Sequence, residues 1–244
     1  MHLSTDGIIV RENIASENDK YIVALTRSNG LVSAYARGVR SVKNRNASGC
    51  GLLCYSDLTF FKSRDTYKLD EATPKEIFWG LREDIQRLAL AQYFCELCIV
   101  LAPEGSEAEE YLRLMLNALA FLAKGEKLPD LIKAVVELRM LTLSGYMPDL
   151  VCCAACGEDT DDHMVFSVRE GRLFCTKHRP GAGEILLDRT LLAAMRHIAY
   201  SDFERLFRFS MPEKAAAALS RVTERFLLEQ TERGYKTLDF YHSL

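Results

Sequence analysis

The sequence lacks any apolar run of about 18 residues, the length that a membrane-spanning helix requires, so no such helix is predicted. Its first residues contain no basic segment followed by an apolar one, so we expect no signal peptide and a cytoplasmic location. A positive bulk charge is also missing, because the net charge of the 244 residues is −3. Any contact with nucleic acid must therefore come from a local basic surface.

Patterns of several common enzyme classes are absent as well. The sequence contains no G-x-x-x-x-G-K-[ST] phosphate loop and no G-x-S-x-G nucleophile turn. The five histidines are scattered along the chain. We therefore predict a protein that is not an enzyme. A metal-dependent nuclease is a less favoured alternative, for which Asp57, Asp65, Asp70 and Glu71 would supply acids without a recognisable motif.

The first 70 or so residues favour β-structure. Apolar and polar residues alternate there, and turn-forming residues such as Asn29 and Gly30 separate the alternating segments. These segments are 8–10, 21–25, 31–38, 53–62 and 65–70. Five short strands suit a small closed barrel, with one long polar and basic connection at about 39–51.

Helical patterns follow the strands. Thr73, Pro74 and Glu76 resemble a capping box, which predicts a helix from there to about 101. A second capping box, Ser106 with Glu109, predicts the next helix. Further helices are predicted at about 129–144, 188–200 and 212–233. The fold class is α+β and multidomain, with a barrel at 1–73, a helical domain at 74–149 and 184–244, and a cysteine-rich insert at 150–183.

The insert has the spacing C-x2-C-x18-C-x2-H. Its members are Cys153, Cys156, Cys175 and His178. Zinc binds four sulfur or nitrogen ligands as a tetrahedron, and a C-x2-C turn points two thiolates at one ion. The spacer is predicted to form a hairpin that brings the two turns together. Since four protein ligands leave no position for water, we predict a structural zinc ion; the alternative is reduced cysteines in turns.

Two neighbouring residues leave the composition of this site open. Cys152 precedes Cys153 directly, and His163 lies in the spacer. The other cysteines are predicted to pack in the core, where this residue type is frequently buried. They are Cys50, Cys54, Cys95 and Cys98.

Positive charge is concentrated near the N-terminus. Residues 1–75 have a net charge of +3 and residues 76–244 a net charge of −6. Arg37, Arg40, Lys43 and Arg45 fall within nine residues that contain no acid. An exposed positive loop on a small barrel can follow a phosphate backbone by displacing its counterions. The alternative is a solvated loop without a ligand.

Aromatic residues occupy the neighbouring strands. They are Tyr21, Tyr35, Phe60, Phe61 and Tyr67. Some of them could stack on bases, as in sequence-independent binding of single strands, while the alternation of strand faces places others in the core. The sequence does not sort them.

Several segments together resemble the RecO family of recombination mediators. They are 7–10 with 17–19, 25–26 with Gly30, 36–40, 138–148 and 235–238. Each is short, but they occur in the family's order and spacing over essentially the whole chain. The family commonly has cysteine at all four metal positions, whereas this chain has His178 at the fourth, a ligand that zinc also accepts.

The resemblance implies an N-terminal OB-fold, a helical C-terminal domain and a zinc ribbon. It also implies binding of single- and double-stranded DNA, annealing of complementary strands, and a nucleoid-associated location. RecR, the single-strand-binding protein SSB and, indirectly, RecA are the implied partners. By position, Arg37, Arg40, Lys43 and Arg45 would contact DNA, and Cys153, Cys156, Cys175 and His178 would bind zinc.

A protein-interaction scaffold with little direct DNA binding is the main alternative. The helical domain offers basic residues that could meet an acidic, apolar-tipped tail such as that of SSB. The candidates are Arg113, Arg139, Arg196 and Arg205.

Overall fold

A computed structural model describes residues 2–63, 66–159, 162–179, 181 and 183–244. The chain forms two compact units, one of Met1–Lys124 with Thr237–Leu244 and one of Gly125–Lys236. Among the helices of the described residues, none combines the length and the apolar character needed to cross a bilayer.

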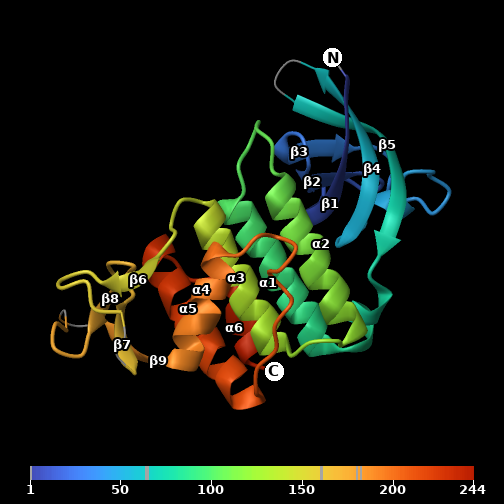
Figure 1. Ribbon diagram of the computed structural model, residues 1–244. Helices are drawn as coiled ribbons and strands as arrows, with labels where there is room; N and C mark the ends of the chain where they lie inside the picture. The colour runs from blue at the N-terminus through green and yellow to red at the C-terminus, as the bar shows by residue number, and fades with distance from the viewer. Residues whose placement is uncertain (1, 64–65, 160–161, 180, 182) are drawn as a thin grey trace. The chain divides into compact units, whose positions relative to one another are not determined.

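The first unit contains a closed five-stranded barrel (Figure 1). Its strands are β1 (His2–Ile14), β2 (Lys20–Thr26), β3 (Gly30–Ala36), β4 (Cys54–Ser63) and β5 (Thr66–Ile77). The order around the barrel is β1-β2-β3-β5-β4, and β3 with β5 is the parallel pair. Strand β1 pairs with β2 and β4, and its bulge between Ile9 and Arg11 accompanies the bend that this requires. The predicted OB-type barrel and its five strands are confirmed.

The predicted helix start at Thr73 is wrong. Strand β5 continues to Ile77 and pairs with β4 throughout. Pro74 lies where the register between these strands shifts, a position at which its missing N–H is tolerated. The first α-helix, α1 (Ile85–Leu101), begins instead after Asp84, whose carboxylate accepts hydrogen bonds from two backbone amides of the first turn.

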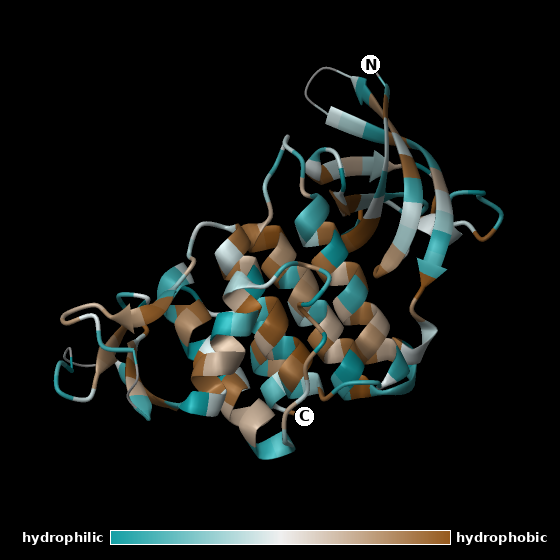
Figure 2. Cartoon of the chain, in the orientation of Figure 1, coloured by the Kyte–Doolittle hydropathy of each residue, from teal (hydrophilic) through white to brown (hydrophobic). Residues whose placement is uncertain are grey.

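Two further helices belong to this unit, α2 (Glu109–Lys124) and α6 (Lys236–His242). Helix α6 was not predicted from the sequence. Its start is held by Glu96, whose carboxylate accepts hydrogen bonds from the amide and the hydroxyl of Thr237. In Figure 2 apolar residues dominate α1. The cysteines outside the insert are buried as predicted: Cys50, Cys54, Cys95 and Cys98.

A charged cluster joins the barrel to α2 within this unit. The Arg27 guanidinium donates to Asp6 at 2.7 Å and to Glu109 at 2.8 Å. The hydroxyl of Tyr55 also donates to Asp6. The hydrogen bonds from Arg27 lower the pKa of Asp6 most strongly, burial opposes them and Tyr55 adds to them, which brings the value from 3.8 to about 2.

This shift predicts an acid-sensitive contribution to stability. A folded-state pKa below the unfolded value stabilises the fold above about pH 4, and this contribution falls as pH decreases toward 2. Asp6→Asn is expected to lower the free energy of unfolding by about 2 kcal/mol at pH 7 and by about half as much at pH 3. Urea unfolding at both pH values measures this difference.

The matched control is Asp57→Asn, because the Asp57–Lys75 pair is solvent-exposed. Such a pair contributes below about 1 kcal/mol, so this variant should differ little from the wild type at either pH. If Asp6→Asn lowers the free energy of unfolding equally at pH 7 and pH 3, the lowered pKa of Asp6 is not the source of an acid-sensitive contribution to stability.

The second unit combines three helices with a four-stranded sheet. The helices are α3 (Pro129–Leu143), α4 (Arg189–Tyr200) and α5 (Glu213–Thr231). The strands are β6 (Asp149–Cys153), β7 (His163–Ser167), β8 (Arg172–Cys175) and β9 (Glu184–Asp188), in the order β6-β8-β7-β9. Between α3 and α5, buried Lys133 pairs with Glu137 at 2.8 Å and with Glu224 at 2.7 Å. This pairing compensates much of the cost of burying a charge.

Candidate metal centre and nucleic-acid interface

Two cysteine turns follow the ends of neighbouring strands. Because β6 and β8 are parallel, Cys153 and Cys175, which end these strands, lie at the same edge of the sheet. The amide of Gly157 donates to the carbonyl of Cys153 at 2.8 Å, and the amide of His178 donates to that of Cys175 at 3.0 Å. Gly157 has φ +75°, a conformation that glycine adopts without strain. The predicted hairpin between the turns is formed by antiparallel β7 and β8.

The four donor atoms of these turns converge. The Sγ atoms of Cys153, Cys156 and Cys175 and a ring nitrogen of His178 all lie within 4.8 Å of one another. The Sγ atoms of Cys156 and Cys175 are 3.9 Å apart, and Cys175 Sγ is 3.1 Å from His178 Nδ1. A zinc tetrahedron with such ligands has edges of about 3.5–3.8 Å, so the group fits a metal ion of this size. Neither Cys152 nor His163 belongs to this group of described residues.

Backbone amides prepare one thiol for metal binding. Burial alone would raise the pKa of the Cys153 thiol, but hydrogen bonds from the backbone of Cys175, Ala155 and Cys156 outweigh it and lower the pKa to about 6. The thiolate is the form that binds metal. The turn geometry therefore favours the thiolate at Cys153, whereas hydrogen bonding and charge from Cys153 help to raise the pKa of the neighbouring Cys156 thiol.

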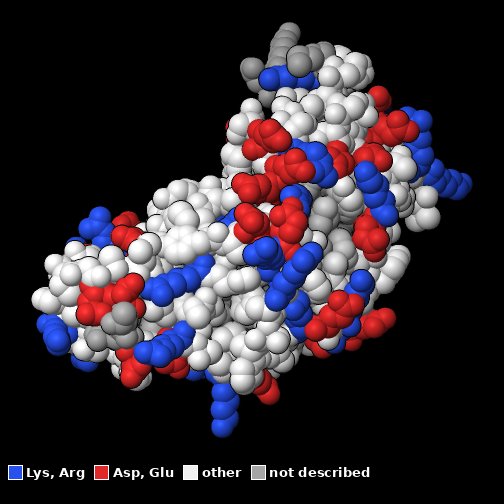
Figure 3. Space-filling model, in the orientation of Figure 1, with Lys and Arg blue, Asp and Glu red and all other residues white. Residues whose placement is uncertain are grey.

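The basic loop, residues 37–45, projects from the barrel after β3. The side chains of Arg37, Arg40, Lys43 and Arg45 are all exposed. None of the four forms an ion pair with a residue that the structure describes. Figure 2 shows this loop as mostly hydrophilic, and Figure 3 shows Lys and Arg side chains gathered where it projects. Their charges are therefore available to an external anion.

Hydrogen bonds hold the basic loop in consecutive turns. The amide of Ser41 donates to the carbonyl of Gly38, and the amide of Asn44 donates to that of Ser41. Next to the loop, the buried Asn46 side chain donates to the carbonyl of Asp70 at 2.9 Å and accepts from the amide of Ala72 at 3.2 Å. The loop is thus anchored to β5, and its cations extend from a defined backbone.

The structure sorts the aromatic residues of the barrel. Phe60 is fully buried, and Tyr67 packs against the same core. Tyr21 and Phe61 are 56% and 39% exposed, and Tyr35 is half-buried on the outer face. The alternation of strand residues predicted such a division, but the sequence did not show which of the aromatic residues face the core.

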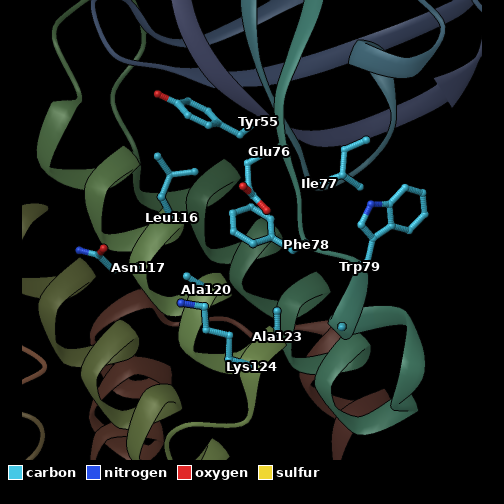
Figure 4. A pocket seen from close by; sticks show the side chains of 11 residues that line it. Tyr55, Glu76, Ile77, Phe78, Trp79, Leu116, Asn117, Ala120, Ala123 and Lys124 are labelled. Carbon is cyan, nitrogen blue, oxygen red and sulfur yellow. The ribbon is translucent and has the colours of Figure 1, made fainter.

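A pocket of about 570 Å³ lies beside β5 and α2 in the first unit (Figure 4). Phe78, Leu116 and Ala120 supply apolar lining, and Glu76 and Asn117 supply polar groups. Trp79 lines it too and is 66% exposed, with the Arg82 guanidinium 5.2 Å from the centre of its ring. No pattern in the sequence pointed to this pocket.

Of the acids considered for a nuclease, the three within the described residues lie exposed on the barrel surface. Asp57 pairs with Lys75 on the barrel surface, and Asp70 and Glu71 are exposed. Asp65 lies outside the described residues. Within the part of the chain that the structure describes, these carboxylates form no group able to hold a metal ion. The geometry therefore gives the nuclease alternative no support.

Two of the arginines considered for an acidic tail are engaged in the fold. Arg139 is buried, donates to the carbonyls of Ile198 and Ala199 and lies 5.9 Å from the ring centre of Phe203. Arg196 donates to the carbonyls of β6 at 2.6 and 2.7 Å. Arg139 is therefore wrongly proposed as a surface residue.

The fold and these sites define an OB-fold protein with a helical region and a Cys/His group able to hold a metal ion. The family model "Recombination protein O N terminal" matches residues 1–78, and "Recombination protein O C terminal" matches residues 82–239. The chain belongs to the RecO family of DNA repair proteins.

Three similar proteins are each named DNA repair protein RecO. The protein of Acetivibrio thermocellus is 32% identical over 244 residues, which cover 100% of this chain and 97% of the relative. That of Symbiobacterium thermophilum is 30% identical, with 99% and 97% covered. That of Alkaliphilus metalliredigens is 28% identical, with 96% and 95% covered. The similarity thus extends over both units.

Proposed function

We propose that this protein is a recombination mediator that binds single- and double-stranded DNA and anneals complementary strands. With RecR it would help to load RecA onto SSB-coated DNA, in the cytoplasm at the nucleoid. The observation that carries this proposal is the acid-free basic loop on an OB barrel, whose four cations are exposed and without ion pairs among the described residues. Family membership supports the biological context.

The cations of the loop would act on phosphates and not on bases. Phosphate contacts position a protein on DNA without reading its sequence, as a mediator requires. Because each contact releases condensed counterions, binding is favoured by entropy and weakened by salt. Two strands near one cationic surface repel each other less, so pairing is accelerated without covalent chemistry.

The Cys/His group would hold a structural zinc ion. Cys153, Cys156, Cys175 and His178 supply four donors, so the ion would cross-link the ends of β6 and β8 and take no part in a reaction. The hairpin of β7 and β8 would then be fixed relative to β6.

The pocket beside Trp79 favours an additional role in protein interaction. An exposed tryptophan next to an apolar cavity is typical of surfaces that bind a partner side chain. RecR and SSB are the proposed protein partners. A scaffold role with little direct DNA binding is the alternative, and the following experiment distinguishes it from the mediator role.

Binding of a fluorescent single-stranded oligonucleotide, followed as salt is raised, tests the proposal. Four phosphate contacts to a single strand predict a slope of log affinity against log salt of about −3. Annealing of complementary strands should accelerate over the same salt range in which binding occurs. If the protein does not bind the oligonucleotide at low salt, the scaffold alternative is favoured over the mediator role.

A further inference from the structure

Two tyrosines lie opposite each other on the outer face of the barrel. Tyr21 on β2 pairs with Tyr35 on β3, and their ring centres are 5.2 Å apart at an interplanar angle of 66°. Their strand neighbours Ile22, Ala34 and Ala36 belong to the buried core. Both tyrosines therefore point outward, and Tyr21 leaves 56% of its surface exposed.

A hydrogen-bonded cluster fixes the orientation of this pair. The Tyr35 hydroxyl donates to the Asp19 carboxylate, which also accepts from the Gly38 amide at 2.7 Å and from the Ser16 hydroxyl at 2.8 Å. The edge-to-face contact then orients Tyr21 on Tyr35. A ring held in place before a ligand arrives loses little further freedom on binding.

Three cations lie on or next to the elements that carry the tyrosine pair and its supporting cluster. Arg37 follows Tyr35 by two residues, directly after β3, and is exposed. Lys68 on β5 pairs with Tyr35 and is exposed. Arg40 is bonded to the β1–β2 turn, since its guanidinium donates to the carbonyl of Ser16 at 2.9 Å. Positive charge therefore lies on the strand next to Tyr35 and in the segment after it, together with the Asp19 carboxylate that holds Tyr35.

We infer that Tyr21, supported by Tyr35, is a stacking platform for unpaired nucleobases, next to the cations that hold the phosphates. This inference rests on the proposed function and adds a contact to bases. Every base has a π-face, so stacking tolerates any sequence. Bases inside a duplex are covered by their neighbours, so the platform acts on single strands alone. The platform would therefore bind single strands only, whereas the basic loop would bind both single- and double-stranded DNA.

Abasic DNA isolates this contact. The wild type is compared on three ligands of equal charge: an oligo-dT, an abasic oligonucleotide of the same length, and a duplex with the same number of phosphates. We expect about tenfold tighter binding of oligo-dT than of the abasic strand. Tyr21→Ala should reduce oligo-dT affinity about tenfold and leave abasic affinity, duplex affinity and the salt slope unchanged.

Two further variants control for folding and for general aromatic effects. Tyr21→Leu keeps an apolar side chain against Tyr35 and should lose the same preference as Tyr21→Ala, whereas Tyr21→Trp should retain it. Phe240→Ala removes another exposed aromatic ring, 46% exposed on α6, and should bind all three ligands as the wild type does.

The outcomes distinguish this inference from the proposed function. Salt-dependent binding with equal affinity for oligo-dT and abasic DNA overturns the platform and leaves the phosphate-binding loop in place. A Tyr21→Leu variant that folds and keeps the full preference for oligo-dT also overturns it. Wild-type protein that binds none of the ligands at low salt overturns both proposals.

Discussion

Changing Arg37, Arg40, Lys43 and Arg45 to Glu is expected to reduce affinity for single-stranded DNA by about 1000-fold or more at low salt. Four counterion-releasing contacts are lost, and four like charges repel the phosphates. The slope of log affinity against log salt should fall from about −3 toward zero. Fluorescence anisotropy with a labelled oligonucleotide measures both quantities.

The variant should fold, because all four side chains are exposed and the main anchor of the loop is unchanged, although the exposed hydrogen bond from the Arg40 guanidinium to the carbonyl of Ser16 is lost. That anchor is the pair of hydrogen bonds between Asn46 and β5. Circular dichroism and urea unfolding should therefore resemble those of the wild type. Surface substitutions of this kind usually change stability by about 0.5 kcal/mol or less each.

A matched control reverses four exposed cations in the second unit. They are Arg208, Lys214, Arg221 and Arg225. The total charge changes equally, so an effect of bulk charge would appear in both variants, whereas a local site predicts less than about threefold loss in the control. If the loop variant bound single-stranded DNA as tightly as the wild type, the loop would not be part of the DNA-binding site. The membership of the chain in the family would be unaffected.

The β-structure could be predicted from sequence where the signal was local. Strand-like segments bounded by turn residues identified all five strands of the barrel, and each strand contributes residues to the buried core. In β1, however, residues 7–10 are buried consecutively and do not alternate. The error at Thr73–Glu76 has a physical cause. A capping box is a local pattern, and pairing of β5 with β4 over the same residues overrode it. Pro74 is compatible with both outcomes, so it could not decide between them.

Features that depend on distant contacts were not predictable. Helix α6 has seven residues, too few for a clear periodic signal, and it is held by Glu96 from about 140 positions earlier in the chain. The burial of Arg139 follows from carbonyls on α4 that the sequence does not place beside it. Local patterns carry no information on such pairs.

The Cys/His group was predictable because the spacing of its residues in the sequence largely determines where the donor atoms lie. Two short turns each present two donors, and the hairpin between them sets their separation. The choice among candidates was not predictable, since Cys152 and His163 have suitable chemistry. Cys153 ends β6 beside β8, where it meets the donors of the second turn. Strand register therefore decides which of two adjacent cysteines belongs to the group.

If the proposed zinc ion is bound, its loss is expected to unfold the sheet of the second unit. Binding at a site with four protein ligands is coupled to folding, and structural zinc contributes about 10 kcal/mol or more in small zinc domains. We expect one zinc ion per chain by elemental analysis. Cys175→Ser, or a strong chelator, should remove it and make the segment 149–188 sensitive to proteolysis, with a lower melting temperature.

Cys152→Ser is the matched control, because Cys152 adjoins the group without belonging to it. It should keep the full zinc content and wild-type protease resistance. The basic loop belongs to the other compact unit, so DNA binding by the Cys175→Ser variant should remain within about threefold of the wild type at the same salt concentration. Full zinc content in the Cys175→Ser variant would exclude Cys175 as a ligand. Chelation that removes zinc but leaves the melting temperature and the proteolysis unchanged would instead show that the ion has no structural role.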